Sequence, residues 1–229
     1  DEELAKKIDV KPDQCFVGFD AYKNVIAACD VVLLCTPPHF RPLHIEAAVK
    51  AGKMVVDGAF VSADSYGGGA GGRISVTADD LRLGNQGKIR SASYGRGSAG
   101  SISVDAARLM LGGNASINSD SLGDGAAGEV RVEAANLRLA GDSYITSDGV
   151  SQGGGGAVTV KATRLALVTG GFIAAETYQD GVSGAVDVSA ESLVLDNGHI
   201  ATQARPGSSG DAGTIHVQAD TITADRKST

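Results

Sequence analysis

The chain has 229 residues, a net charge of −7, 32 Gly, three Cys and no Trp. An acidic balance argues against a nucleic-acid partner, because binding to phosphates needs a basic surface. The sequence predicts no transmembrane segment, since it lacks a run of about 18 apolar residues. It also has no basic stretch followed by an apolar one, so we expect no signal peptide in this chain.

The composition changes abruptly at Asp57. Residues 1–57 contain all three Cys, four of the five Pro and only two Gly, whereas residues 58–229 contain the other 30 Gly and one Pro. Such a shift indicates a boundary between parts with different folds. We therefore predict two domains, an α/β segment over residues 1–56 and a repeat domain over residues 57–229.

Strands and helices alternate in the first domain. A short strand is expected near Phe16, followed by a helix over residues 21–28. The apolar run 31–35, closed by a pair of prolines, predicts a buried parallel strand. An amphipathic helix over residues 41–52 and a further strand from Lys53 follow. This alternation predicts a βαβ unit.

The first domain resembles the dinucleotide-binding domain of the Gfo/Idh/MocA oxidoreductases. The resemblance rests on FVGFDAY from Phe16, DVVLLCTPPH from Asp30 and AAVKAGK from Ala47. It implies NAD(P) as the cofactor and a Rossmann-type fold. The candidate cofactor contacts that it implies are Thr36, Pro37 and Pro38.

The first domain departs from that family's pattern at two places. The GxGxxG turn, which holds the dinucleotide pyrophosphate at a helix N-terminus, does not occur in it. Gly58, Ala59 and Phe60 stand where the family has Glu-Lys-Pro, whose lysine serves catalysis. We therefore expect a truncated Rossmann-like segment with no catalytic residue and no bound cofactor, which acts at most as a cap on the repeat domain.

The second domain consists of copies of one unit. Glycines spaced 28, 28, 28, 28 and 29 residues apart each open the pattern Gly-x-Ile/Val-x-Val-x-Ala-x-x-Leu-x-Leu, which the last copy ends as Ile-Thr. Regular internal repeats of this length indicate a solenoid. The opening glycines are Gly72, Gly100, Gly128, Gly156, Gly184 and Gly213.

Apolar and polar residues alternate within each unit, which is the period of a strand. One unit cannot bury its own apolar face, but stacked units place each apolar position over its equivalent. The repeat therefore predicts a mainly β fold, a right-handed parallel β-helix of about six 28-residue coils. An alanine recurs at a corner that we expect to be too tight for larger side chains. This structural ladder comprises Ala78, Ala106, Ala134, Ala162, Ala190 and Ala219.

The units resemble the repeats of filamentous-haemagglutinin-like exoproteins, the secreted adhesins of two-partner secretion in Gram-negative bacteria. The resemblance covers about 57–229 and rests on the "aGxIxVxAxxLxL" strand pair, the "xxIxSxS" strand and the Gly/Ser-rich return loop. It implies a non-catalytic, structural or adhesive segment that is secreted or at the cell surface. Its implied partners are host-surface or matrix glycans or proteins.

Two other functions remain open from the sequence. The chain could be a fragment of an NAD(P)-dependent oxidoreductase of the Gfo/Idh/MocA type, with the repeats as an accessory. It could also be a carbohydrate-active β-helix protein, since lyases and hydrolases with this fold carry paired carboxylates or arginines on an outer face. The second domain has acidic residues in its loops and on its strands that keep this alternative open.

No metal is predicted. His39 and His44 are five residues apart with no third ligand nearby, which favours solvated side chains over a zinc site. Acidic loop residues suggest calcium, but the nonapeptide repeat of calcium-binding β-rolls is missing. These loop residues are Asp120, Asp124, Asp180 and Asp211.

Two surface patterns also follow from the repeat. Tyr66, Tyr94 and Tyr178 recur at one position, and we expect an apolar stack there rather than a platform for sugars. Oppositely charged residues one coil apart are expected to form surface ion pairs, each of small energetic weight. These pairs are Asp80 with Arg108 and Glu133 with Lys161.

Overall fold

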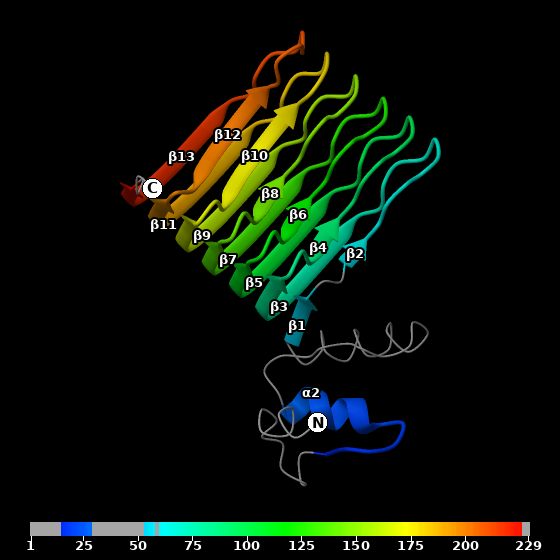
Figure 1. Ribbon diagram of the computed structural model, residues 1–229, viewed down its shortest axis with the longest axis vertical. Coiled ribbons are helices and arrows are strands. Elements are labelled where there is room, and N and C mark those ends of the chain that lie inside the picture. The colour runs from blue at the N-terminus through cyan, green and yellow to red at the C-terminus, as the bar shows by residue number, and fades with distance from the viewer. Residues whose placement is uncertain (1–14, 29–52, 58–59, 226–229) are drawn as a thin grey trace, which may run out of the picture. The chain divides into compact units, whose positions relative to one another are not determined.

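The computed structural model describes residues 15–28, 53–57 and 60–225. The chain divides into two compact units, residues 1–55 and 56–229. In the first unit, helix α2 (Ala21–Ala28) has the predicted bounds (Figure 1). It buries only Ile26 among the described residues.

The strand expected near Phe16 is wrong. Residues 15–17 have no regular structure, and the side chains of Val17 and Phe19 are each 94% exposed. A strand needs a neighbour for its backbone groups, and none pairs with this stretch within the described residues. Gly18, at φ 100°, instead turns the chain into α2. The other elements expected between residues 29 and 52 lie outside the described residues, so the Rossmann-like segment stays a prediction.

The second unit is a parallel β-solenoid of about six coils, as the repeat predicts. Each coil contributes one strand to a long-strand sheet and one to a short-strand sheet (Figure 1). Partner residues are 28 apart in most pairings, such as Ile74 with Ile102 and Val130 with Val158. The long-strand sheet runs in the order β1 (Lys53–Asp57), β3 (Ile74–Gly84), β5 (Ile102–Leu111), β7 (Val130–Leu139), β9 (Val158–Val168), β11 (Val186–Asp196) and β13 (Ile215–Asp225).

The short-strand sheet comprises β2 (Phe60–Ser62), β4 (Lys88–Arg90), β6 (Ser116–Asn118), β8 (Tyr144–Thr146), β10 (Phe172–Thr177) and β12 (His199–Ala204). A row of single bridges continues it from coil to coil, beginning at Ser65 and Ser93. Ile173 pairs with Ile200, which is 27 rather than 28 residues further along the chain, so this sheet accommodates a coil that is one residue shorter here. The register of the side chains is therefore kept through the irregular spacing.

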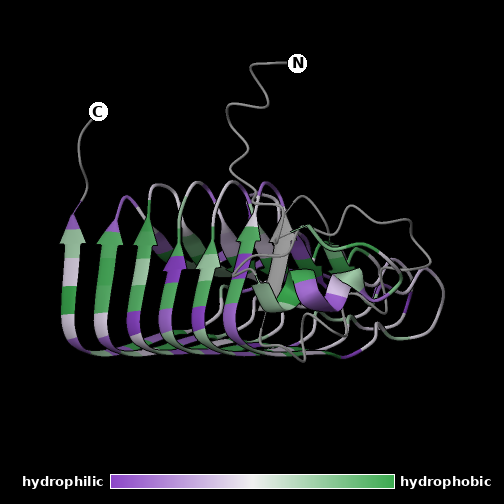
Figure 2. Cartoon of the chain, turned by 90° about the horizontal axis from the view of Figure 1, so that it is seen from below, coloured by the Kyte–Doolittle hydropathy of each residue, from purple (hydrophilic) through white to green (hydrophobic). Residues whose placement is uncertain are grey.

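The core follows from the alternation of apolar and polar residues (Figure 2). In β3, Ile74, Val76, Leu81 and Leu83 are buried, and the residues beside them point away from the core. The same positions are buried in β5 and β7. In the short-strand sheet the buried position is an isoleucine, as in Ile117. Each ladder residue packs on its equivalent in the next coil, so burial is shared along the stack.

Each long strand bends directly after the alanine ladder. Ala78 pairs with Ala106 and Asp80 with Arg108, so Asp79 is skipped and two consecutive residues face outward. Alanine is buried at this bend in the first three coils and partly exposed in the last three.

Substitution at the bend tests how tight the corner is. Ala134→Leu is expected to lower the free energy of unfolding by about 1–3 kcal/mol, because extra methylenes overpack a buried site. Ala219→Leu is expected to cost less, since Ala219 is partly exposed in β13, the last strand of the sheet. Urea unfolding of the full chain measures both. Equal losses of stability in Ala134→Leu and Ala219→Leu would show that packing between neighbouring coils does not limit the side-chain size at this bend.

A left-handed turn follows each of the long strands β3, β5, β7, β9 and β11. Asn85, Gly113, Gly141, Thr169 and Asn197 occupy one position of the repeat, all with φ between 44° and 61°. Glycine and asparagine adopt this conformation readily, whereas a β-branched residue does so only with strain.

Thr169 is therefore the strained member of this row, with φ 50°. We expect Thr169→Asn to raise the free energy of unfolding by about 1 kcal/mol, since relief of a left-handed conformation is worth this much. Thr159→Asn in β9 is the matched control and should give no gain, because strands favour β-branched residues. Urea unfolding of both variants and the wild type measures the difference. If Thr169→Asn is less stable than the wild type, the turn at Thr169 carries no strain.

The return loops are clamped by a row of buried serines. The Ser119 hydroxyl donates to the carbonyl oxygen of Gly100 at 2.6 Å and accepts from the Gly128 N–H at 3.1 Å. Ser91 and Ser147 make the same pair of bonds in their coils. These loop glycines are needed for close approach rather than for positive φ, because a Cβ on Gly128 would lie 2.3 Å from the Gly100 carbonyl oxygen.

Candidate functional site

The outer face of the short-strand sheet carries a groove of about 480 Å³ over β8, β10 and β12. The opposite side of these strands is the isoleucine ladder of the core, so alternation alone directs the groove residues outward. We call this the acidic groove. It is lined by Asp120, Tyr144, Thr146, Asp148, Phe172, Glu176, Tyr178, His199, Gln203 and Arg205.

One wall of the acidic groove is a stack of rings. The rings of Tyr144 and Phe172 lie 5.2 Å apart, and those of Phe172 and His199 lie 4.9 Å apart. The stack forms because the three residues occupy the first position of successive short strands. The faces of the rings are turned to one another, so it is mostly ring edges that border the groove.

The floor of the acidic groove is a row of carboxyl groups, one per coil. Asp120, Asp148 and Glu176 occupy the same position in three successive coils, 28 residues apart. Each of the first two accepts a hydrogen bond from the next backbone N–H in the row. The Asp148 N–H donates to Asp120 Oδ1 at 3.3 Å, and the Glu176 N–H donates to Asp148 Oδ1 at 2.9 Å. The backbone therefore holds the carboxyl groups in line.

Burial raises the pKa of two carboxyl groups in this row. Burial raises the pKa of Asp148 from 3.8 to about 8, and the neighbouring carboxyl groups of Asp120 and Glu176 add to the rise. Burial also raises the pKa of Asp120 to about 6, against the opposing effects of the Asn118 amide and the Asp148 N–H. Poor solvation disfavours the ionised form of both carboxyl groups, and repulsion between like charges adds to the shift of Asp148.

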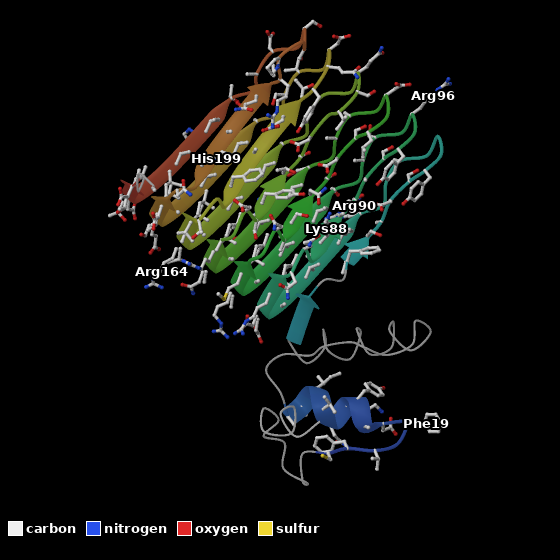
Figure 3. All side chains as sticks on the ribbon, viewed as in Figure 1. Phe19, Lys88, Arg90, Arg96, Arg164 and His199 are labelled. Carbon is white, nitrogen blue, oxygen red and sulfur yellow. The ribbon has the colours of Figure 1, made fainter. Side chains whose placement is uncertain are left out.

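Glu176, at one end of the acid row, and Asp64, outside its other end, are each bound by an arginine. Arg205 Nε donates to Glu176 Oε2 at 2.8 Å, and the Arg205 guanidinium lies 5.2 Å from the centre of the Tyr178 ring. Asp64 occupies the same position two coils before Asp120, with Ala92 between them, and is bound by Arg90 through both side-chain oxygens, with Nε 3.2 Å from Oδ1. Figure 3 places Arg90 on β4 and His199 on β12, toward opposite ends of the same sheet.

The centre of the row has no such partner within the described residues. Ion pairs of the described residues involve neither Asp120 nor Asp148. Thr146 lines the groove, is 2% exposed, and its Oγ1 makes no hydrogen bond of normal geometry, although it lies close enough to Asp148 to favour the ionised form of that carboxyl. The groove thus holds two carboxyl groups and a buried hydroxyl with unused bonding capacity.

A second groove of about 560 Å³ follows the bend in the long strands. Side chains of both signs line it, including Glu133 and Lys161, and its base is the alanine ladder. It has no aromatic residue, and its charges are mixed along its length. It therefore offers fewer features for recognition than the acidic groove.

The surface pairs expected from the sequence are met in part. Arg108 Nε lies 3.3 Å from Asp80 Oδ2, which confirms that pair. Glu133 and Lys161 are neighbours in register, but the ion pair of Glu133 is with Arg131 of its own strand, so the expected pair is wrong. Arg131 lies two residues away on the same strand face and reaches the carboxylate without crossing between coils.

Of the three tyrosines that share one position of the repeat, the first two stack on each other. The rings of Tyr66 and Tyr94 are 4.7 Å apart and nearly parallel. Tyr178 is separated from them by two coils and contacts Arg205. The stacking of Tyr66 on Tyr94 confirms the prediction for these two residues.

Several candidate residues stay untested. The expected cofactor contacts Thr36, Pro37 and Pro38 lie outside the described residues, as do His39 and His44. Within the described residues, no three His, Cys, Asp or Glu side chains come together as a metal site requires. No helix among them has the length and apolar character that a membrane crossing needs. The exposed loop residues are Asp124, Asp180 and Asp211.

Sequence reasoning missed the acid row. It singled out Asp120 as a loop residue, yet passed over Asp148 and Glu176 because it searched for a calcium motif rather than along the register. The signal was present, since these residues recur at the 28-residue spacing of the ladders.

No protein-family model, curated protein or solved structure matches this chain. The two family resemblances therefore rest on the sequence motifs.

Proposed function

We propose that this chain is a non-catalytic adhesive segment of a haemagglutinin-like exoprotein, secreted or held at the cell surface of a Gram-negative bacterium. Its partners in this proposal are host-surface or matrix glycans or proteins, and residues 1–56 act at most as a cap. One observation carries the proposal. Coils of about 28 residues stack in one register and present an outward groove of about 480 Å³, within the about 300–1,000 Å³ typical of ligand clefts.

The regularity of the stack favours a scaffold. Ladder residues such as Val104, Val132 and Val160 repeat through the coils, so most of the sequence serves stacking. The residues that vary from coil to coil lie on the outer faces of the two sheets, and on the short-strand sheet Tyr144, Phe172 and His199 occupy one position. A constant core with a variable outer surface is suited to display.

A specific observation also favours a carbohydrate-active enzyme as a second candidate. Asp120, Asp148 and Glu176 lie in successive coils, about 4.8 Å apart by strand spacing, close to the about 5–5.5 Å between the carboxyl groups of retaining glycosidases. The pKa of Asp148 is raised to about 8, which is the direction that a general acid needs. A proton donor and a neighbouring carboxylate would then be available together.

Binding and turnover measured together distinguish the two candidates. The full chain is applied to an array of glycans and extracellular-matrix proteins, and the bound oligosaccharides are then assayed for new reducing ends and unsaturated products. An adhesive segment is expected to bind a target and leave it chemically unchanged. Turnover that is lost in Asp148→Asn, but kept in the long-strand variant Asp187→Asn, would replace the adhesive proposal by the enzymatic one.

The oxidoreductase alternative has its own test. Calorimetric titration of the full chain with NAD(H) and NADP(H) is expected to show no binding in the micromolar range. Micromolar binding of either cofactor would overturn the adhesive proposal.

A further inference from the structure

The carboxyl groups at this position of the repeat are paired with an arginine in some coils and not in others. Asp64, two coils before Asp120, binds Arg90, whose guanidinium lies 5.9 Å from the centre of the Tyr94 ring. Glu176, at one end of the acid row, binds Arg205, which lies over the Tyr178 ring. The same three groups, a carboxylate, a guanidinium and a tyrosine ring, therefore meet twice on this face.

The register shows what replaces the arginine in between. Arg90 pairs with Asn118 in the next coil, and Asn118 pairs with Thr146 in the coil after that. Asn118 still donates to the Asp120 carboxylate through its side-chain amide. Arg90 lies in the coil after Asp64, 26 residues further along the chain. The same step leads from Asp120 to Thr146 and from Asp148 to Ala174. Both residues are short and uncharged, so neither carboxyl receives a cation at the place where Arg90 serves Asp64.

The unused capacity at this place points to a ligand. The Thr146 Oγ1 is buried without a hydrogen bond of normal geometry and lines the groove beside Asp148. Among the described residues, no cation makes an ion pair with Asp120 or Asp148. Buried polar groups without partners are rare in folded proteins and call for a missing group. A planar guanidinium fits carboxylate oxygens with several donors at once, more closely than an ammonium ion does.

We propose that the acidic groove binds an arginine side chain of a partner protein, whose guanidinium takes the place beside Asp148 and Asp120 that Arg90 takes beside Asp64. The arginine belongs to a partner in this proposal because the two arginines nearest the row are already engaged with Asp64 and Glu176. Glu176 and the Tyr144 ring border the same space, so the aliphatic part of the incoming side chain has an apolar edge to pack on. This inference rests on the adhesive role proposed above and names the chemistry of the protein partner.

The charges around the site support this choice of ligand. Arg90 and Lys88 act on Asp120 from one side, and Arg205 holds Glu176 on the other. Burial and the neighbouring carboxyl groups leave Asp148 protonated near neutral pH, so an incoming cation would displace a proton and gain a charge-assisted hydrogen bond.

A short peptide tests the site. The probe is an N-acetylated, C-amidated peptide with one arginine between two glycines, titrated into the full chain about one pH unit above the pKa of Asp148. Carboxyl-carbon NMR of Asp120 and Asp148 reports the location of binding, and calorimetry reports the affinity. The same peptide with citrulline, which keeps the shape but not the charge, and with lysine are the comparison ligands.

The expected result is saturable movement of both carboxyl resonances with the arginine peptide. The affinity of the citrulline peptide should be lower by about tenfold or more, which is the loss expected for one charge-assisted hydrogen bond. The lysine peptide should also bind more weakly than the arginine peptide. Asp148→Asn should weaken arginine binding about tenfold, whereas Asp187→Asn, an exposed carboxylate on the long-strand sheet, should leave it unchanged.

Contrary results are equally distinct. The guanidinium assignment would be overturned if the citrulline or lysine peptide bound as tightly as the arginine peptide, or if Asp148→Asn bound the arginine peptide as tightly as the wild type. It would also be overturned if glucosamine, an amino sugar titrated in the same way, bound more tightly than the arginine peptide. Array binding separates this inference from the adhesive role on which it rests. If the wild-type chain adheres and Asp148→Asn adheres equally well, the groove assignment fails while the adhesive role stands. If the arginine peptide binds but the chain adheres to nothing, the adhesive role fails.

Discussion

Gly128→Ala is expected to lower the free energy of unfolding by about 3 kcal/mol or more, the upper part of the range for overpacked sites. An added Cβ would lie 2.3 Å from the Gly100 carbonyl oxygen and 2.6 Å from Ser119 Oγ. Both atoms belong to the bonded clamp between coils, so neither can move away without breaking hydrogen bonds. The neighbouring coils must therefore separate locally, which also exposes ladder residues.

Gly67→Ala is the matched control for this substitution. Gly67 also lies in a return loop, but a Cβ there meets no atom within 4 Å. We expect a change in stability of less than about 0.5 kcal/mol, as for a surface position. Urea unfolding of both variants, followed by circular dichroism, gives the comparison. Equal effects at Gly67 and Gly128 would mean that the loops are not packed coil on coil.

The second large effect is a fall in stability as the pH rises. In the folded chain the pKa of Asp148 is about 8 and that of Asp120 about 6, both above the unfolded value of 3.8. Between about pH 4 and pH 8 the folded chain therefore binds protons that the unfolded chain has released, and the free energy of unfolding decreases with pH. Each pKa unit corresponds to about 1.4 kcal/mol, so the two groups together contribute several kcal/mol across this window.

Asp148→Asn isolates this contribution. Asparagine resembles the protonated carboxyl group and can keep the hydrogen bond from the Glu176 N–H. The variant should match the wild type near pH 4 and become the more stable of the two as the pH rises to about 9. Asp187→Asn should leave the pH dependence of the wild type unchanged. Urea melts across this range provide the measurement, and a wild type that gains stability between pH 4 and pH 8 would contradict the raised pKa values.

Much of the solenoid could be predicted because its signal is repeated. Val76 and Leu81 are buried where alternation places them, and each later coil repeats the same evidence in its own residues. Helix α2 was also predicted with its bounds. The strand predicted near Phe16 does not form, because a strand needs a partner and the sequence alone does not show whether one lies beside it.

The candidate site was harder to predict for a physical reason. Its residues differ in type from coil to coil, as Asp148 does from Glu176, so a search for the same residue type in every repeat does not find them. They come together only because the backbone register places them in one row. The buried Thr146 hydroxyl was harder still to predict, since its lack of a hydrogen-bond partner depends on the packing around one side chain. The core ladders can be predicted because their residues repeat in every coil, whereas the site residues differ from coil to coil.

The central claim is that residues 28 apart lie one above the other, since the acid row exists only in that register. Spin labels at Thr77 and Gln218 test it most directly. These exposed residues are joined by five steps of register through Asp105, Glu133, Lys161 and Ser189. Electron–electron distance measurement on the doubly labelled full chain should give one narrow distribution centred at about 24 Å, five times the strand spacing of about 4.8 Å. A broad distribution, or a centre far from this value, would contradict the stacked register and with it the acidic groove.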